Sequence, residues 1–445
     1  PLISLTHGSI KSETLTSGDP VPPYTVSPDD TAMVQFSSGT TVAPKPVALS
    51  HRQLIANADA IMDYFPLDDG IEHAGVSWLP LYHDMGLIGC IIPAVLRTGP
   101  LTLIPPEVFL ARPAIWLRAI SRYKATLSPA PDFAYGLCVD RIRDEELEDC
   151  DLSSWRLAMN GAESVSASRA QAFVNRFHQW GFRPEAMTPV YGLSEAALAV
   201  CFSDPTQPFR HLVLDSESLS QGQIRIVEPD SPPLHSTHIT SVGRPLRGFE
   251  VEIRDRDGTA LPEASLGRIW VSGPSLMTGY LGGLPSPIEE GWLHTGDLGF
   301  IYDQEVYISG RAKDVIVLRG RNHSPSSIED SLFDVEEVRR GCTAAVGLVD
   351  SEGDRLLVFV EVQSPKKDTA ERCRATIRAA TGLDADLVVV IEPGVLPRTS
   401  SGKIRRAEAL RRWQTGELLP PDRVTPWMLT GALARSALGY LRSRS

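Results

Sequence analysis

Apolar residues recur along the chain in two patterns, short runs and helical spacings. The short apolar runs predict buried strands at Met33–Phe36, Gly75–Leu79, Leu101–Ile104 and Ala125–Ser128. The helical spacings predict helices at His51–Tyr64, Ala114–Tyr123 and Ala167–Trp180. Strands that alternate with helices in this way favour an α/β fold with largely parallel sheets.

The pattern changes after Gln223. The segments IRIVE, EVEIRD and RIWVSG alternate polar and apolar residues, which predicts short strands joined by turns such as Asp257-Gly258. A compact module then follows residue 310, with strands expected at Ala344–Val349, Leu356–Val362 and Asp386–Ile391. We therefore expect a large N-terminal domain (1–310, with a β-rich subdomain at about 223–310) and a small C-terminal domain (311–445). The amphipathic tail (Trp427–Leu441) indicates a surface helix or a linker.

Composition narrows the class of protein. The 445 residues carry 43 Lys and Arg against 55 Asp and Glu, a net charge of −12, which argues against non-specific nucleic-acid binding. The six cysteines lack CxxC spacing, so neither a zinc site nor a disulfide framework is indicated. The most apolar run, Leu87–Leu96, is too short to span a membrane, and the N-terminus shows no signal peptide. These features predict a cytoplasmic protein with reduced thiols.

The segment Gln35–His51 suggests chemistry on phosphate groups. Between a strand-like run and Lys45 it holds small hydroxyl residues and a glycine: Ser37, Ser38, Gly39, Thr40 and Thr41. Backbone N–H groups, hydroxyls and an ammonium in one loop bind phosphate oxygens well. No Gly-Lys-Ser/Thr follows Gly39, so this is not a Walker loop.

Four further motifs follow that loop in order: PVYGLSEAAL at 189–198, GWLHTGDLGF at 291–300, GRAKDVIVLRGRNHSP at 310–325 and LPRTSSGKIRR at 396–406. Together with the loop they resemble the adenylate-forming superfamily of acyl-CoA synthetases, peptide-synthetase adenylation domains and luciferases. The resemblance covers the chain from about residue 30 to about residue 412. It implies activation of a carboxylic acid by ATP and Mg²⁺, with a small C-terminal domain that is mobile.

The resemblance assigns nucleotide-binding roles to residues of these motifs. Thr40, Thr41 and Lys45 match the residues that hold the β- and γ-phosphates, and Glu195 matches the Mg²⁺ ligand. Asp297 and Arg311 match the residues that bind the ribose. The remaining matched positions, which include the wall around the adenine, are Ser38, Gly39, Gly161, Ala162, Glu163, Tyr191, Gly192 and Ser194.

Three more residues take catalytic or hinge roles by the same resemblance. Lys403, in TSSGKIRR, matches the lysine that enters the site for adenylation and bridges the carboxylate and the α-phosphate. His83, in LPLYHDMG, matches a gate beside the acyl site, where it would neutralise or orient the substrate carboxylate. Lys313 matches the hinge about which the small domain rotates between an adenylating and a transferring pose.

Details of the motifs resemble the fatty acyl-AMP ligase branch. This branch passes a fatty acyl group to the phosphopantetheine thiol of an acyl carrier protein, and an insertion like Cys201–Thr240 disfavours CoA by restraining the small domain. An acyl pocket is expected around Phe133, Ala134, Tyr135 and Gly136, in the PxFAY motif. Asp132 stands in that motif where Asn is commoner.

Two alternatives stay open at this level. An acyl-CoA synthetase would use the same motifs with CoA as acceptor. A catalytically silent adenylate-fold protein, which only binds nucleotide or an acyl group, is favoured by Val42 and by a missing upstream segment. Val42 and Pro46 replace loop glycines that are common in the family, and Val42 stiffens the loop. Family members usually carry a hundred or more residues before the phosphate loop, so we expect an upstream segment that this sequence lacks.

Overall fold

The computed structural model describes residues 4–5, 8–9, 25–37, 44–64, 70, 72–228, 235–350, 353–399 and 402–419. The phosphate-loop residues 38–43 and the expected helix at residues 427–441 lie outside this range. Within it, the fold is a mixed α/β arrangement of several sheets, as the sequence predicts.

A seven-stranded sheet forms the centre of the molecule, in the order β13-β10-β9-β8-β7-β5-β6. The five strands from β9 to β6 run parallel, whereas β10 and β13 are antiparallel to their neighbours. The strands are β5 (Gly75–Ser77), β6 (Leu101–Leu103), β7 (Leu127–Pro131), β8 (Leu157–Gly161), β9 (Met187–Gly192), β10 (Ala199–Phe202) and β13 (Arg244–Pro245). Because β8 and β9 are parallel neighbours, their carboxyl ends lie side by side at the same edge of the sheet.

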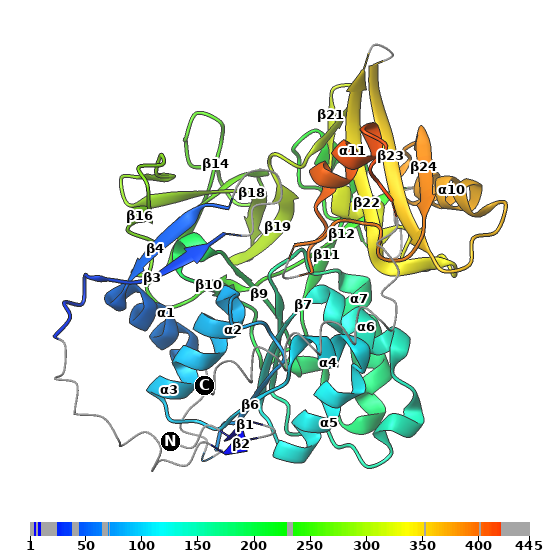
Figure 1. The fold of residues 1–445 in the computed structure, drawn as a ribbon. Helices are drawn as coiled ribbons and strands as arrows, with labels where there is room; N and C mark the ends of the chain where they lie inside the picture. Colours follow the sequence, from blue (N-terminus) through cyan, green and yellow to red (C-terminus); the bar gives the residue numbers. More distant parts are fainter. Residues whose placement is uncertain are drawn as a thin grey trace, which may run out of the picture.

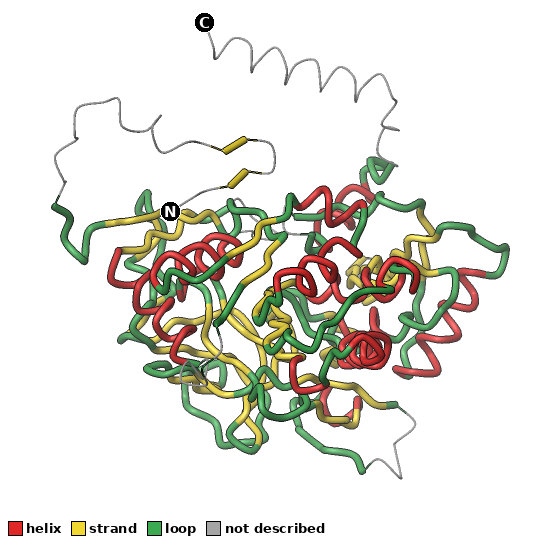
Figure 2. The backbone as a smooth tube through the Cα atoms, turned by 90° about the horizontal axis from the view of Figure 1, so that it is seen from below, coloured by secondary structure: helices red, strands yellow, loops and turns green. Residues whose placement is uncertain are grey.

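Helices lie around these strands (Figures 1 and 2). They are α1 (His51–Asp63), α2 (Asp84–Gly86), α3 (Ile92–Leu96), α4 (Pro106–Ala111), α5 (Ala114–Tyr123), α6 (Asp132–Arg141) and α7 (Ala167–Phe177). A capping box formed by Ser50 and Gln53 fixes the start of α1. Under α5–α7 the core is aromatic, with Trp116, Tyr135 and Phe173 fully buried. The three helices predicted from spacing all form.

A smaller antiparallel sheet packs beside α1. It comprises β3 (Thr31–Phe36), β4 (Pro46–Ser50) and β16 (Gly279–Tyr280). The prediction that Met33–Phe36 is a buried strand was wrong in its burial, because β3 is an edge strand and Phe36 is 61% exposed. Met33 is partly buried against the core beside α1, but no residue of the strand is fully buried.

The β-rich region forms a five-stranded sheet of β14 (Glu250–Arg254), β15 (Gly267–Ser272), β17 (Ile288–Glu289), β18 (Trp292–Tyr302) and β19 (Glu305–Arg311). The predicted turn forms at Asp257-Gly258, where Gly258 has φ +86°. The predicted strand IRIVE was wrong: Ile226 makes only an isolated bridge to Leu214. The partner of Ile226, Leu214, lies on β11 (His211–Asp215). The regular partner of β11 is β12 (Ser236–Thr240), and α8 (Ser216–Ser220) follows β11 directly in the chain.

The last part of the described chain, residues 316–419, is called here the C-terminal unit. Its elements are β20 (Ile316–Leu318), β21 (Arg321–His323), α9 (Pro325–Asp330), β22 (Val338–Asp350), β23 (Gly353–Val362), α10 (Thr369–Thr381), β24 (Leu387–Ile391) and α11 (Arg406–Gln414). The order of its main sheet is β22-β23-β24. This unit stands over α6 and α7, and β22 packs against α6 (Figure 1). Among the described residues, no helix is both long and apolar enough to cross a membrane.

Candidate active site

A large cavity of about 770 Å³ opens between the main part of the molecule and the C-terminal unit. It lies at the carboxyl ends of β8 and β9, where ligands bind in open α/β sheets. Residues from five sequence motifs line it, so segments far apart in the chain meet here. The C-terminal unit contributes a wall that includes Arg398, Lys403 and Arg406.

Asp297 organises one side of the cavity. It is almost fully buried, accepts a 2.6 Å hydrogen bond from the Tyr191 hydroxyl and pairs with Arg311 Nε at 2.7 Å. Strand pairing places Asp297 directly opposite Arg311 on β18 and β19. The charge of Asp297 raises the pKa of Arg311 above its ordinary value. A buried carboxylate fixed by two donors suits the recognition of vicinal hydroxyls.

Glu195 faces the cavity from the turn after β9. Its Oε1 accepts a 2.9 Å hydrogen bond from the hydroxyl of Tyr280. The Tyr280 ring also lies under Lys45, whose Nζ is 4.8 Å from the ring centroid. Tyr280 thus joins the predicted metal ligand to the predicted phosphate-binding lysine.

His83 and Asp84 form a polar pair at the start of α2. The His83 Nδ1 lies 2.7 Å from Asp84 Oδ1, and the Ser194 hydroxyl donates to Asp84 Oδ2 over 2.5 Å. Burial alone would raise the Asp84 pKa, but the hydrogen bond from His83 and the other donors lower it to about 2. An ionised carboxylate is therefore fixed beside His83, facing the cavity.

The end of β8 is shaped by close backbone packing. A Cβ on Gly161 would lie 2.6 Å from a Val190 methyl, and the next residue, Ala162, has φ +66°. Glu163 then turns back and accepts a 2.7 Å hydrogen bond from the Phe133 N–H. Burial raises the pKa of Glu163. This tight turn leaves backbone groups at the cavity wall, where a base edge is expected to bind.

Lys403 reaches the same cavity from the C-terminal unit. Burial lowers the pKa of its ammonium, and the charge of Asp84 partly opposes that shift. Its loop turns at Gly402, which has φ +91°, and a Cβ there would lie 2.7 Å from the Phe133 ring. Arg398 steadies the loop by donating to Gly402 O over 2.8 Å. The structure therefore has the pose in which this lysine sits in the site.

The remaining predicted residues divide into three groups. Gly192 and Lys313 line the cavity, and burial lowers the pKa of Lys313. Ser38, Gly39, Thr40 and Thr41 lie outside the described residues. Of the predicted acyl pocket only Phe133 lines the cavity, because Ala134, Tyr135 and Gly136 face the helical core; Tyr135 donates to Met159 O. The acyl role of these three stays a prediction.

Two residues of the site were not singled out from the sequence. Asp84 follows His83 directly in LPLYHDMG, and that adjacency was a usable signal because two titratable groups stand together after an apolar strand. Tyr280 gave no such signal, since 85 residues separate it from Glu195.

Comparison with known proteins identifies the class of enzyme. A family model for AMP-binding enzymes matches residues 4–281. The medium-chain fatty acid–[acyl-carrier-protein] ligase JamA of Moorena producens is 35% identical over 88% of this chain and 69% of that protein. The long-chain fatty acid–AMP ligase FadD28 of Mycobacterium tuberculosis is 34% identical over 90% of this chain and 73% of that protein.

A solved structure from studies of the fatty acyl-adenylate ligases of E. coli and L. pneumophila superposes with a TM-score of 0.82. It is 35% identical, over 89% of this chain and 72% of that one. The sequence and structure comparisons each cover close to nine tenths of this chain. The chain therefore belongs to the AMP-binding enzyme family and, within it, to the AMP-forming fatty acyl ligases.

Proposed function

We propose that this chain activates a fatty acid with ATP and then transfers the acyl group to the phosphopantetheine thiol of an acyl carrier protein. In the first step a carboxylate oxygen bonds to the α-phosphorus, and the bond from that phosphorus to the pyrophosphate oxygen breaks. In the second step the thiol attacks the acyl carbon, AMP leaves, and the thiol proton is released. The observation that carries the proposal is the entry of Lys403 into the cavity that holds Asp297, Arg311 and Glu195.

The groups around the cavity divide the work of adenylation. Asp297 binds the ribose hydroxyls, with its geometry set by Tyr191 and Arg311. Lys403 places a cation where negative charge grows between the carboxylate and the α-phosphate. His83, held by Asp84, orients the incoming carboxylate. Because negative charge on the phosphate oxygens is greatest in the transition state, the Lys403 cation stabilises that state more than the bound substrates.

The donor set fits a magnesium ion shared with phosphate groups. Among the described residues no cluster of three or more His, Cys, Asp or Glu side chains is suited to hold a metal. Mg²⁺ commonly binds through one or two protein carboxylates plus substrate phosphates. Glu195, with one oxygen fixed by Tyr280, supplies such a carboxylate. The ion would supply positive charge beside the phosphate oxygens.

The acyl chain has an apolar route out of the cavity. Four apolar residues line the same cavity as Phe133: Ile61 of α1, Met159 of β8, Leu198 just before β10, and Phe202 of β10. These side chains are buried or partly buried and belong to the core between α1 and the central sheet. We propose that the fatty acyl tail lies against this wall, with Phe133 at its entrance.

Contacts of the β11–β12 region support the proposal that it restrains the C-terminal unit. Glu217 Oε1 of α8 lies 3.1 Å from Arg321 Nη1 of β21, an ion pair between the two segments. His235 Nδ1 lies 3.3 Å from the backbone oxygen of Ala379 in α10. A Cβ at Gly382 would lie 2.7 Å from the His235 ring, so the two segments touch. A hinge that must rotate past these contacts rarely adopts the transferring pose.

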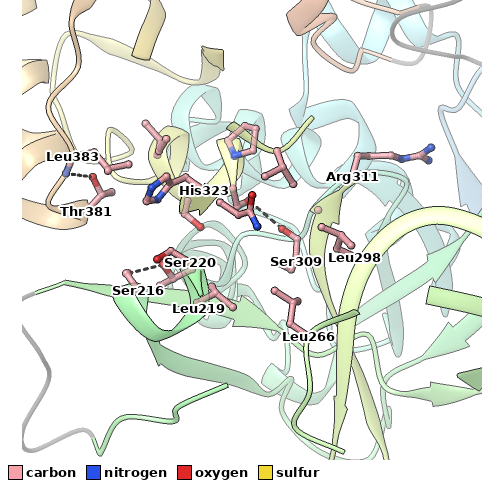
Figure 3. Close-up of a pocket in the computed structure, with 18 residues that line it drawn as sticks. Ser216, Leu219, Ser220, Leu266, Leu298, Ser309, Arg311, His323, Thr381 and Leu383 are labelled. Carbon is pink, nitrogen blue, oxygen red and sulfur yellow. Dashed lines mark hydrogen bonds between the residues drawn. The ribbon is translucent and has the colours of Figure 1, made fainter. Parts of the chain in front are cut away.

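A small cavity of about 60 Å³ lies between the same two segments, next to the proposed hinge (Figure 3). Ser216, Leu219 and Ser220 of α8 form one wall, and Thr381 and Leu383 of the C-terminal unit form another (Figure 3). Ser309 and Arg311 lie at the point where β19 ends and the proposed hinge at Lys313 begins. This arrangement supports a domain boundary at residues 310/311.

Product analysis tests the proposal against its rivals. Mass spectrometry after incubation with ATP, Mg²⁺ and a panel of carboxylic acids should find an acyl-adenylate and pyrophosphate. Adding a phosphopantetheinylated carrier protein should then give an acyl thioester on that protein. Efficient formation of acyl-CoA when CoA replaces the carrier would favour an acyl-CoA synthetase instead. A protein that releases no pyrophosphate with any acid would be a silent binding protein.

A further inference from the structure

Arg169 occupies an unusual place at the boundary between the main part of the molecule and the C-terminal unit. It lies in the first turn of α7 and is 8% exposed. Its guanidinium pairs with Asp132, a fully buried carboxylate at the start of α6. Asn160 donates a second hydrogen bond to Asp132 over 2.8 Å. The buried carboxylate of Asp132, in the main part of the molecule, therefore fixes the position of the Arg169 guanidinium.

The free face of Arg169 meets the C-terminal unit. Its guanidinium carbon is 5.8 Å from the centroid of the Phe333 ring, within range of a cation–π contact. A Cβ on Gly341 would lie 3.6 Å from Arg169 Nη2. The carboxylate of Asp330, at the end of α9, also faces the arginine, whose charge lowers the pKa that burial raises.

Space for this arginine is built into α6. A Cβ on Gly136 would lie 2.9 Å from Arg169 Cδ, so a larger residue at position 136 would displace the side chain. Gly136 therefore accommodates the arginine stem rather than facing the cavity.

The contact continues from Arg169 to the catalytic loop. Arg398 donates to Gly341 O over 3.0 Å through Nη2 and to Gly402 O over 2.8 Å through Nη1. The side chain of Arg398 thus connects Gly341, which lies against Arg169, to Gly402 in the turn before Lys403. A second guanidinium, that of Arg340, lies 4.4 Å from the centroid of the Phe333 ring and pairs with Asp140 of α6 at 2.8 Å.

We propose that Arg169, charged and held by Asp132, is a positioning residue that seats the C-terminal unit in the adenylating pose. Arg169 lines the same cavity as Lys403, and the role assigned to it is to position the C-terminal unit rather than to contact the reacting atoms. It supplies a fixed cation against which Phe333, Gly341 and Asp330 dock, and docking places Lys403. Rotation into the transferring pose removes these contacts, so Arg169 serves the first half-reaction alone. This inference rests on the two-step function proposed above.

The test uses paired substitutions, because removing Arg169 alone would leave Asp132 buried without its partner. The double variant Asp132→Asn/Arg169→Met removes both charges and keeps an acceptor for Asn160. The matched control is Arg176→Met, because Arg176 lies on the same helix but pairs with Asp144 and Ile142 O within the main part of the molecule. A third variant, Phe333→Ala, removes the contact from the other side.

Two half-reactions are measured separately. We expect acid-dependent pyrophosphate release to fall roughly tenfold or more in the double variant, within the range of coupling between sites. ATP binding by calorimetry, and transfer from supplied acyl-adenylate to the carrier thiol, should match those of wild type and Arg176→Met. Adding Phe333→Ala to the double variant should cause little further loss, because both changes break one contact. Equal losses in the two half-reactions, or adenylation at the wild-type rate, would overturn the proposal.

Hydrogen exchange gives a readout that does not depend on activity. Amides of α9 and of the Lys403 loop should exchange faster in the double variant than in Arg176→Met. Unchanged exchange would overturn the seating role even if the enzyme were inactive. A wild-type enzyme that releases no pyrophosphate would refute the proposed function but leave this measurement of docking valid.

Discussion

The Tyr280 hydroxyl donates a 2.9 Å hydrogen bond to the Glu195 carboxylate. The bond fixes one oxygen of the proposed magnesium ligand and leaves the other for the ion. Phe at position 280 would keep the ring beneath Lys45 and remove only this bond. A Tyr280→Phe substitution therefore tests the hydrogen bond to the metal ligand without removing the ring beside Lys45.

We expect Tyr280→Phe to reduce the gain in ATP affinity that Mg²⁺ provides by roughly ten- to a hundredfold, the effect of losing one hydrogen bond to a charged metal ligand. Calorimetric titration of ATP at a series of Mg²⁺ concentrations measures this. Tyr280→Leu, which also removes the ring under Lys45, should lose ATP affinity further. Equal magnesium dependence in wild type and Tyr280→Phe would show that the hydrogen bond has no part in metal binding.

Lys403→Ala should abolish acyl-adenylate formation while ATP still binds and the fold is kept. The lysine contributes a charge that matters most when negative charge develops in the transition state, so turnover falls more than binding. Pyrophosphate release and ATP calorimetry report the two effects. Lys124→Ala removes an exposed lysine paired with Asp151 and serves as a control. Unchanged pyrophosphate release in Lys403→Ala would refute the role.

Asp297→Ala should weaken ATP binding instead. The substitution removes the proposed contacts to the ribose and leaves Tyr191 and Arg311 without their shared acceptor. Losing a charged hydrogen-bond partner costs about 1.5–3 kcal/mol. Calorimetry should detect this loss, whereas Asp303→Ala, at an exposed pair with Arg210, should bind ATP normally. Wild-type affinity in Asp297→Ala would make Asp297 a structural turn residue only.

Much of the fold and site follows from local sequence. The helices at 51–63 and 114–123 are signalled by spacing and, for the first, by its capping box. Motifs from four different sheets meet in one cavity, and only the position of each motif at or near the end of a strand or on a connecting loop is readable locally. Long-range pairings carry no local signal: Asp132 meets Arg169 across 37 residues, and Phe36 is exposed because β3 lies at an edge. The Asp132–Arg169 pairing and the exposure of Phe36 depend on tertiary position, which the local pattern of apolar residues does not encode.

The β11–β12 pair allows a clean deletion. Asp215 and Ser236 are directly opposite each other, so residues 216–235 could be replaced by an Asn-Gly turn without breaking the strand pairing. The deletion removes α8 and the contact of His235 with the C-terminal unit. Cys201 and Phe202 stay, because both are buried in the core.

We expect this variant to form some acyl-CoA and to keep adenylation. A change of about 1.4 kcal/mol in the balance of the two poses gives tenfold more of the transferring pose. Acyl-CoA is measured by mass spectrometry at saturating CoA. A variant that still makes acyl-adenylate but yields no acyl-CoA would place the exclusion of CoA elsewhere.

Docking of the C-terminal unit should weaken as pH rises from about 4 to about 7. Burial raises the pKa of Asp330 from 3.8 to about 7, against the charge of Arg169; Asp132 and Glu329 also raise it, and Ser166 bonds to it. The docked state therefore binds more protons than the undocked state, and stability falls with pH between these two values. Above about 7 the effect is complete.

Asp330→Asn should remove this slope. Hydrogen exchange of α9 between pH 5.5 and 7.5, corrected for intrinsic rates, measures it. Asp334→Asn, an exposed aspartate four residues away, should keep the wild-type slope. The same slope in Asp330→Asn as in wild type would assign the pH dependence to another group.

The contact between Gly402 and Phe133 has a consequence for selectivity. The ring of Phe133, at the entrance to the proposed acyl wall, is also the surface on which the Lys403 loop rests. An acid whose shape pushes that ring aside would tilt the loop and withdraw the ammonium from the α-phosphate. Discrimination between acids can then appear in turnover rather than in binding, since a poorly fitting acid would enter yet seldom be activated. The Phe133 ring would then select among acids by controlling whether Lys403 reaches its active position.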